Sequence, residues 1–238
     1  MSRSRQIIAI GGAALPPELD NLALIAYFLR QTRKRRPKVC YLGTAGGDSE
    51  AGRLRFYAGF SQVECRPTHL TLFARTPPDL QAFLLEHDAI FVGGGNTRSL
   101  LAVWRDWGVD VHLRRAWERG VVLGGVSAGA ICWFEEGLTD SVAGPLTILP
   151  GLGFLPGSCC PHYDSERDRR PTFRRLIARG AMAPGVAADD GVALHYVGDT
   201  LAHVVSSSRR ARGYTVRPSR SRQSASERVL PTRYLARP

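Results

Sequence analysis

A serine within a run of small residues is the first candidate for chemistry in this 238-residue chain. Residues 125–129 read Gly-Val-Ser-Ala-Gly, which satisfies the G-x-S-x-G pattern of a nucleophile elbow. A β-branched run precedes this segment and a helical stretch follows it, and small neighbours let such a strand and helix approach closely. The Ser127 hydroxyl would then lie at a helix N-terminus, where free N–H groups favour developing negative charge. We therefore predict that Ser127 is a nucleophile; a structural turn is the alternative.

A second glycine-rich run, Gly-Gly-Gly-Asn-Thr at 93–97, follows one apolar strand-like run and precedes another helical stretch. Its bare backbone N–H groups could face a ligand. The run lacks the lysine of a P-loop and the spacing of G-x-G-x-x-G, which disfavours phosphate binding. Beside a nucleophilic serine it predicts an oxyanion hole formed by the N–H groups of Gly94 and Ala128, with a plain strand-to-helix turn as the alternative. We expect Gly93 and Asn96 to contact the substrate.

A serine nucleophile requires a base, and the chain has six histidines. His162 lies in a polar segment after a glycine-containing turn and is followed by charged residues. A loop histidine in such surroundings suits proton transfer near neutral pH. His195 and His203 alternate with apolar residues and are expected on strands, whereas the patterns around His87 and His112 are helical. His162 is therefore the predicted base.

The elements that must position these residues follow an alternating pattern. Short apolar runs alternate with amphipathic stretches, which indicates an α/β protein whose mostly parallel sheet has helices on both faces. We find no internal repeat and no clear linker, and we predict one domain over 1–217. The predicted strands are 7–10, 39–42, 89–92 and 121–123, and the predicted helices are 18–33, 48–60, 78–86, 97–107 and 109–119.

The pattern changes after Ser127. Residues 137–157 are rich in Gly and Pro and are expected to form a loop with short extended pieces. A helix is predicted over 171–179, with proline suited to its first turn, and short strand-like runs follow up to residue 216. Residues 218–238 are rich in Ser, Arg and Pro, and we expect a flexible basic tail there.

Composition limits the class of protein. The hydrophobic share is 44% and the charged share 22%, as in soluble globular proteins, and no apolar run is long enough to span a bilayer. Five cysteines show no CxxC or zinc spacing, and scattered thiols fit a reducing compartment. The N-terminus shows no signal peptide, so we expect a cytoplasmic protein with no membrane partner.

The net charge of +11 is concentrated at one end of the chain. Residues 209–238 contain nine arginines and one acid, which leaves a charge of +3 for the rest. A basic tail can bind polyanions, but the sequence shows no nucleic-acid-binding motif. We therefore expect the tail to be solvated and nucleic acid not to be a partner.

Three segments together resemble the dipeptidase E family of serine peptidases, which are relatives of the class I glutamine amidotransferases. They are residues 93–97, residues 125–130, and Pro161-His162-Tyr163 with the arginine-rich run after it, and their order and spacing fit over 6–216. The resemblance implies a flavodoxin-like fold, Ser127 as nucleophile and His162 as base. The amidotransferases carry cysteine at the elbow, so serine disfavours amide transfer. Cys132 would point elsewhere.

The resemblance also implies the remaining site residues. The triad acid falls shortly after the elbow helix in the family, which points to Asp140, with Glu136 in reserve. Arg169 and Arg170 fall near the family's position for an arginine that grips a substrate carboxylate. A pair of arginines that only faces solvent is the alternative.

The sequence thus predicts a serine peptidase that hydrolyses short peptides, dipeptides with N-terminal Asp above all. It needs no metal or organic cofactor, and a homodimer is possible. The alternatives are a cyanophycinase-like or other amide hydrolase with the same triad, and a non-catalytic ligand-binding module of the same fold.

Overall fold

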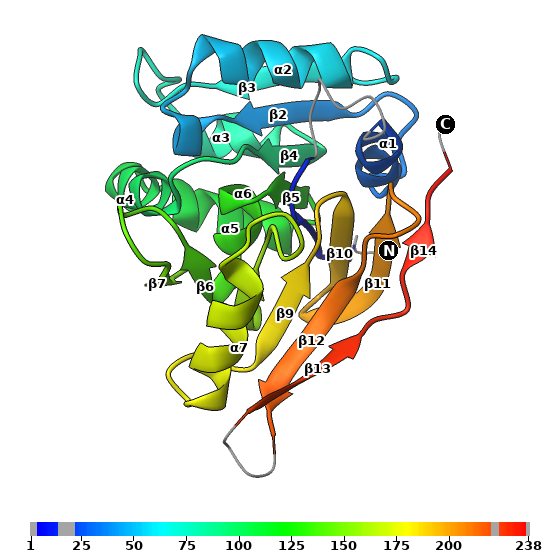
Figure 1. The fold of residues 1–238 in the computed structure, drawn as a ribbon. Helices are drawn as coiled ribbons and strands as arrows, with labels where there is room; N and C mark the ends of the chain where they lie inside the picture. The colour runs from blue at the N-terminus through cyan, green and yellow to red at the C-terminus, as the bar shows by residue number, and fades with distance from the viewer. Residues whose placement is uncertain (1–3, 14–21, 220–223, 237–238) are drawn as a thin grey trace.

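A computed structural model describes residues 4–13, 22–219 and 224–236, which form a mixed α/β fold with two sheets (Figure 1). The helices are α1 (Leu22–Arg30), the 3-10 turn η2 (Thr44–Gly46), α2 (Glu50–Phe60), α3 (Leu80–Leu85), α4 (Thr97–Trp107), α5 (Val109–Glu118), α6 (Ala128–Ile131) and α7 (Arg169–Ala178). The strands are β1 (Gln6–Ile10), β2 (Lys38–Leu42), β3 (Arg66–Leu70), β4 (Ala89–Val92), β5 (Val122–Val126), β6 (Phe134–Thr139), β7 (Thr147–Pro150), β8 (Leu155–Cys160), β9 (Gly185–Ala188), β10 (Val192–Val197), β11 (Thr200–Ser206), β12 (Gly213–Pro218), β13 (Ala225–Val229) and β14 (Arg233–Tyr234).

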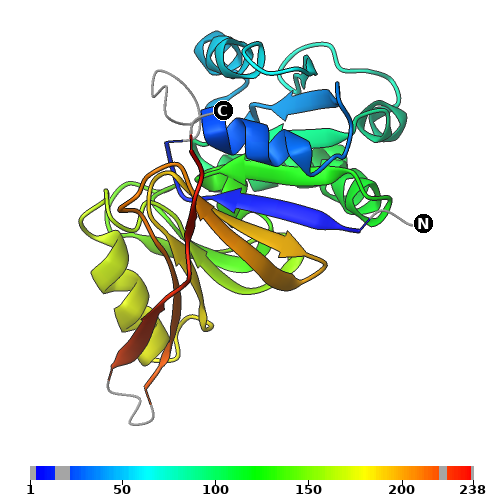
Figure 2. The ribbon, with the colours of Figure 1, turned by 90° about the vertical axis from the view of Figure 1, so that its right-hand side faces the viewer.

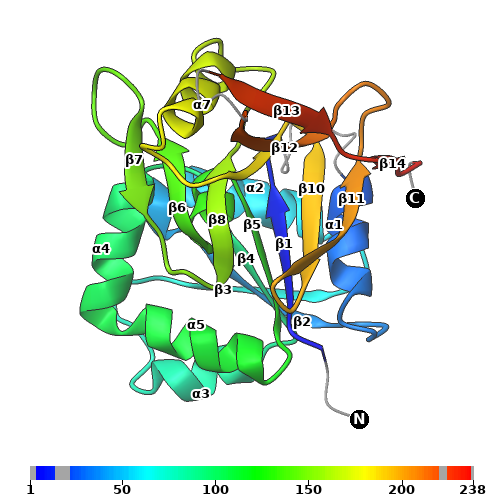
Figure 3. The same cartoon turned by 90° about the horizontal axis from the view of Figure 1, so that it is seen from below.

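The first sheet has a parallel core in the order β1-β5-β4-β2-β3. Strands β10, β11 and β14 extend it beyond β1, with β10 antiparallel to β1 (Figure 3). The carboxyl ends of β1, β5 and β4 therefore lie side by side. That edge is where parallel α/β sheets place their sites.

Alternating side chains of the central strands pack against helices on opposite faces of this sheet. Ile7 of β1 belongs to a core with α4 and α5, whereas its neighbour Ile8 belongs to a second core with α1 and α2. Successive strand residues point to opposite faces, so a strand covered on both sides needs apolar residues at every position. This confirms the expected fold class and the helices on both faces.

The second sheet has the order β13-β12-β9-β8-β6-β7 and mixes parallel and antiparallel pairs. Helix α7 packs on it through a third apolar cluster that includes Phe173 and Ile177. In Figure 2, α7 and the β12–β13 hairpin extend away from the first sheet. This sheet was not predicted, because its strands β6, β7 and β8 lie in or beside the Gly- and Pro-rich region that we expected to be mostly loop.

The predicted helices and strands before Ser127 are otherwise close to those observed, apart from residues 18–21, which lie outside the described residues. Helix α4 has the predicted bounds, and α2, α3 and α5 differ by one or two residues at an end. Strand β3 was missed because it is an edge strand with a proline and only one buried residue, and edge strands carry little apolar pattern.

The segment expected to be a flexible or loosely docked tail contains two strands. Residues 225–229 form β13, antiparallel to β12, and residues 233–234 pair with β11. Ala225 and Leu235 are buried, which anchors this polar segment to the body of the protein. Residues 220–223 and 237–238 lie outside the described residues. No described helix is long and apolar enough to cross a membrane.

One buried histidine makes the stability of the fold dependent on pH. His195 on β10 lies between the Tyr27 hydroxyl, 2.7 Å from Nδ1, and the Gln6 side-chain oxygen, 3.0 Å from Nε2. Burial, and then the charge of His203, lowers the pKa of His195 to about 4. The unfolded chain therefore binds this proton at a higher pH than the folded chain, so stability is lost as the pH falls from about 6.5 towards 4.

We predict that this histidine lowers the free energy of unfolding by about 2 kcal/mol between pH 7.5 and pH 5. His195→Gln should be less stable at pH 7.5 but should lose about 2 kcal/mol less on acidification. Urea denaturation of both proteins at the two pH values measures the difference. Equal losses in both proteins would contradict the assignment to His195.

Candidate active site

Ser127 lies at the carboxyl end of β5, in the tight turn into α6. Its backbone has φ 57° and ψ −112°, a strained conformation for a residue with a side chain. The Ser127 N–H donates to Ile10 O at 3.1 Å, and its carbonyl accepts from Ala130 and Ile131. These bonds hold the strained turn against β1. The geometry is that of the predicted elbow, although the helix after it is a single turn.

The glycines of the elbow allow this close approach. A Cβ atom on Gly125 would lie 2.6 Å from the carbonyl oxygens of Gly129 and Val92. A Cβ atom on Gly129 would lie 2.8 Å from the Val92 side chain. Side chains at either position would push α6 away from β4 and β5. The G-x-S-x-G pattern therefore has a packing cause.

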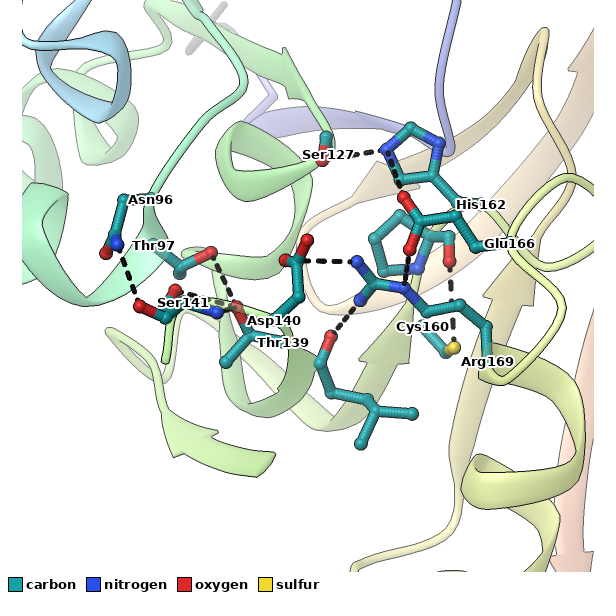
Figure 4. A network of polar contacts seen from close by, with 12 residues as sticks. Asn96, Thr97, Ser127, Thr139, Asp140, Ser141, Cys160, His162, Glu166 and Arg169 are labelled. Atoms are coloured by element: carbon teal, nitrogen blue, oxygen red, sulfur yellow. Dashed lines mark hydrogen bonds and ion pairs between the residues drawn. The ribbon is translucent and has the colours of Figure 1, made fainter. Parts of the chain in front are cut away.

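His162 follows β8 and places its ring against the nucleophile. Its Nε2 lies 2.9 Å from Ser127 Oγ (Figure 4). The residue has φ 52°, so the turn that aims the ring at Ser127 is left-handed. The structure thus brings together the predicted nucleophile and the predicted base from two different sheets.

The acid beside His162 is Asp190, which the sequence analysis missed. Asp190 Oδ1 lies 2.8 Å from His162 Nδ1. Asp190 follows β9 in the turn to β10, and its N–H donates to Asp164 Oδ1. A hydrogen bond from Nδ1–H to Asp190 leaves Nε2 free to accept the Ser127 proton. The available signal was an acidic pair, Asp189-Asp190, at the end of a strand-like run.

Asp140, the acid expected from the family pattern, lies elsewhere. Its Oδ1 accepts from Arg169 Nη2 at 3.2 Å. Glu136, the reserve, accepts from the Ala183 N–H at 2.5 Å. The prediction of Asp140 beside His162 is corrected to Asp190. Strand β6 carries Asp140 towards α7, whereas β9 delivers Asp190 to the first sheet beside Ser127.

The surroundings of Asp190 keep it ionised. Burial raises its pKa, but the hydrogen bond and the charge of His162, together with a hydrogen bond from Ser165, outweigh that effect. The pKa is lowered overall. Its neighbour Asp189 shows the opposite direction, because burial raises its pKa more than its hydrogen bonds lower it. Of the two adjacent acids, Asp190 is the one suited to stabilise a charged His162.

Gly12, just after β1, packs directly against this His–Asp pair. A Cβ atom there would lie 2.5 Å from His162 Nδ1 and would also overlap Asp190 Oδ1. Only glycine lets the backbone after β1 pass at this distance. The carboxyl end of β1 therefore closes one side of the site.

The predicted oxyanion-hole residues flank the nucleophile. Gly94 lies so close that a Cβ atom on it would be 3.3 Å from Ser127 Cβ. Ala128 is the first residue of α6, where a backbone N–H has no partner within the helix. Two backbone hydrogen bonds hold the glycine-rich segment around Gly94. The Gly93 N–H donates to Leu42 O, and the Asn96 N–H donates to Ala45 O.

Asn96 forms hydrogen bonds within the protein, and Gly93 is buried. The Asn96 side chain caps α4 by accepting from Ser99 N–H at 2.9 Å, and it donates to Ser141 O at 2.9 Å. Gly93 lies against Tyr41, since a Cβ atom on Gly93 would overlap the Tyr41 hydroxyl oxygen and lie 3.0 Å from its Cζ atom. Their predicted contact with substrate has no support in this geometry.

The two arginines expected to bind a substrate carboxylate are also engaged. Arg169 is 1% exposed and donates to Glu166, to Asp140 and to the Leu138 carbonyl. Arg170 donates to Glu227 and lies over the rings of Tyr163 and Tyr214. Both guanidinium groups are therefore paired with carboxylates of the protein itself.

A cavity of about 610 Å³ lies next to this network. Glu166 lines it and also approaches His162 Nε2, with Oε1 at 4.0 Å. The other lining residues are Gly144, Pro145, Leu146, Arg167, Asp168, Arg169, Thr172 and Arg175. Within the described residues, no group of three or more His, Cys, Asp or Glu side chains could hold a metal ion. The cavity is large enough for a short peptide.

Comparison with known proteins identifies the family. The model of peptidase family S51 matches residues 7–204, a span that contains Ser127, His162 and Asp190. This chain belongs to peptidase family S51. It is 52% identical to an uncharacterized peptidase, YgaJ, of Bacillus subtilis (strain 168) over 231 residues, 97% of this chain and 99% of that protein.

Solved structures of peptidases show the same fold as this S51 peptidase. A peptidase from an acI-B1 Actinobacterium has a TM-score of 0.68 at 17% identity, covering 97% of this chain and 96% of that one. A putative peptidase E from Listeria monocytogenes EGD-e has a TM-score of 0.59 at 15% identity, covering 96% and 100%. The resemblance to the dipeptidase E family is thereby confirmed at the level of family and fold.

Cys132, five residues after Ser127, is buried and stays a protonated thiol. The Cys132 thiol is buried and donates to the Gly129 carbonyl. Burial, and then the neighbouring Cys159, raises the pKa of Cys132 well above its usual value. All five cysteines are buried free thiols. An unreactive thiol at this position is consistent with serine chemistry.

We predict that Asp190→Asn lowers kcat for peptide hydrolysis by about 10³- to 10⁴-fold, because an amide cannot stabilise charged His162. Asp140→Asn is the control and should lose less than about tenfold. Steady-state kinetics of both variants distinguish the two acids. A larger loss in Asp140→Asn would restore Asp140 as the triad acid.

Gly12→Ala should lower kcat at least about 100-fold, because the new methyl group separates His162 from Asp190. The melting temperature should change by only a few degrees, since the His162 and Asp190 side chains are partly exposed and can move away from the methyl group. Kinetics and thermal melting of the variant, compared with wild type, check this expectation. Wild-type kcat in a folded Gly12→Ala protein would show that this contact does not position the pair.

Proposed function

We propose that this S51 peptidase is a serine peptidase that hydrolyses short peptides, above all dipeptides with N-terminal Asp. The observation that supports this most is the continuous hydrogen-bonded chain from Ser127 Oγ through the His162 ring to Asp190, at 2.9 and 2.8 Å. Distances in this range are those of a nucleophile, its base and the group that orients the base.

In the proposed acylation step, Ser127 Oγ attacks the scissile carbonyl carbon while His162 Nε2 takes the hydroxyl proton. The carbonyl electrons move to oxygen, which the N–H groups of Gly94 and Ala128 bind. Asp190 holds the Nδ1 proton and stabilises the imidazolium. When the C–N bond breaks, His162 gives its proton to the leaving amine.

Deacylation repeats the sequence with water as the nucleophile. His162 takes a proton from water, hydroxide oxygen bonds to the acyl carbon, and the Ser127 ester bond breaks. Ser127 recovers its proton from His162, and the products are a carboxylic acid and an amine. Every proton passes through His162 Nε2, the atom that faces Ser127.

The proposed substrate pocket is the cavity beside Glu166. Arg167 and Arg175 line it, and in the part of the chain that the structure describes neither forms an ion pair. We propose these two arginines, in place of Arg169 and Arg170, for the carboxylates of an acidic short peptide. Guanidinium groups suit this role because they bind carboxylates in a bidentate manner.

Ser127→Ala should lower kcat for hydrolysis of an Asp-led dipeptide by about 10⁶-fold, because the variant has no nucleophile. Wild type should be labelled at Ser127 by a fluorophosphonate, and the variant should not. Peptide mass spectrometry after labelling and chromatographic assay of the released amino acids measure both outcomes.

Ser99→Ala, on the exposed side of α4, is the matched control and should keep wild-type activity and labelling. Equal turnover by Ser127→Ala and wild type would exclude the mechanism. Wild type that cleaves other dipeptides but not Asp-led ones would retain the mechanism and exclude the proposed specificity.

A further inference from the structure

Glu166 is a carboxylate beside the nucleophile that the proposed chemistry does not use. Its Oε2 accepts from Arg169 Nε at 2.6 Å, whereas its Oε1 lies 4.0 Å from His162 Nε2 (Figure 4). The two oxygens therefore face different partners. One is bound to a buried cation, and the other lies on the side of His162 Nε2.

Arg169 fixes Glu166 in this position. The guanidinium is 1% exposed, and it also donates to Leu138 O at 2.6 Å and to Asp140 at 3.2 Å. A buried guanidinium with three acceptors has little freedom to turn, so Glu166 is held by a rigid donor. Two carboxylates, Glu166 and Asp140, share this one cation.

The distances match one particular group of a peptide substrate. Glu166 Oε1 is 4.0 Å from His162 Nε2, which is 2.9 Å from Ser127 Oγ, so Oε1 and Oγ are at most roughly 7 Å apart. In a peptide attacked at its first carbonyl, the α-nitrogen is about 2.5 Å from the carbonyl carbon that Oγ attacks, and thus roughly 3 to 4 Å from Oγ. An α-ammonium there would be within reach of Glu166.

We infer that Glu166 binds the free α-ammonium of the substrate's first residue. The inference rests on the proposed function, since it takes Ser127 as the nucleophile. The Glu166 side chain is 42% exposed and lines the cavity, so a substrate can reach it. Such a contact restricts cleavage to the bond after the first residue, because an acylated nitrogen carries no charge for Glu166 to bind. Glu166 is then the residue that makes this enzyme an exopeptidase.

A different role for Glu166 would be to stabilise the His162 imidazolium through space. That role would act on every substrate, because the imidazolium forms whichever peptide is cleaved. Recognition of an α-ammonium acts only on substrates that carry one. Substrates that differ only in this group separate the two roles.

The test uses two pairs of substrates, Asp-Leu with N-succinyl-leucine and Ala-Leu with N-propionyl-leucine. Each second member lacks only the α-ammonium of the first. Wild type should prefer the amino member of a pair by about 10- to 100-fold in kcat/KM, the usual range for a charge-assisted hydrogen bond. Glu166→Gln should lose this factor, mainly through KM, and should cleave the des-amino members at the wild-type rate.

Glutamine keeps an oxygen that can accept from Arg169, and melting temperatures show whether the variant is folded. Glu118→Gln, an exposed substitution on α5, is the matched control and should retain the wild-type preference. Equal losses by Glu166→Gln on both members of a pair overturn the inference in favour of an effect on His162.

Wild type that cleaves both members of a pair equally also overturns the inference, and this result needs no variant. Absence of turnover on all four substrates, or turnover that survives Ser127→Ala, overturns the proposed function itself. The failure of the inference and the failure of the proposed function are therefore distinct results.

Discussion

The hydrogen bond between Ser127 Oγ and His162 Nε2 joins the two sheets of this protein. Ser127 ends a strand of the first sheet, and His162 follows β8 of the second. Asp190 lies where the chain leaves β9 of the second sheet for β10 of the first. A hydrogen bond tolerates only a few tenths of an ångström, so the docking of the two sheets must be exact to that tolerance. The strands of both sheets must therefore hold Ser127, His162 and Asp190 in place relative to one another.

Charge is arranged around this junction in two separate groups. Arg169 is buried between Glu166 and Asp140, and Arg170 is bound to Glu227 on β13. Glu227 also accepts from the hydroxyl of Tyr163, the residue after His162. Glu227, outside the span matched by the family model, therefore holds the segment that contains His162.

Local pattern predicted the first half of the fold and the centre of the site. Strands that are covered on both faces must be apolar throughout, and helices between them must be amphipathic, so most described elements before Ser127 were predictable, whereas the edge strand β3 was not. Ser127 was predictable because the elbow needs glycine where strand and helix touch, as Gly125 and Gly129 show. The second sheet was not, because β6, β7 and β8 are partly exposed and lie among glycines and prolines.

By itself the sequence determined the family and the α/β class, and it predicted Ser127 as nucleophile and His162 as base, since each of these depends on neighbours along the chain. Only the tertiary structure decided which acid faces His162, because Asp140 and Asp190 have the same side chain and differ in where β6 and β9 place them. The tertiary structure likewise decided that Arg169 forms an ion pair with Glu166. The choice of partner for a charge depends on distance in space, and residues 28 positions apart, such as His162 and Asp190, are brought together only by folding.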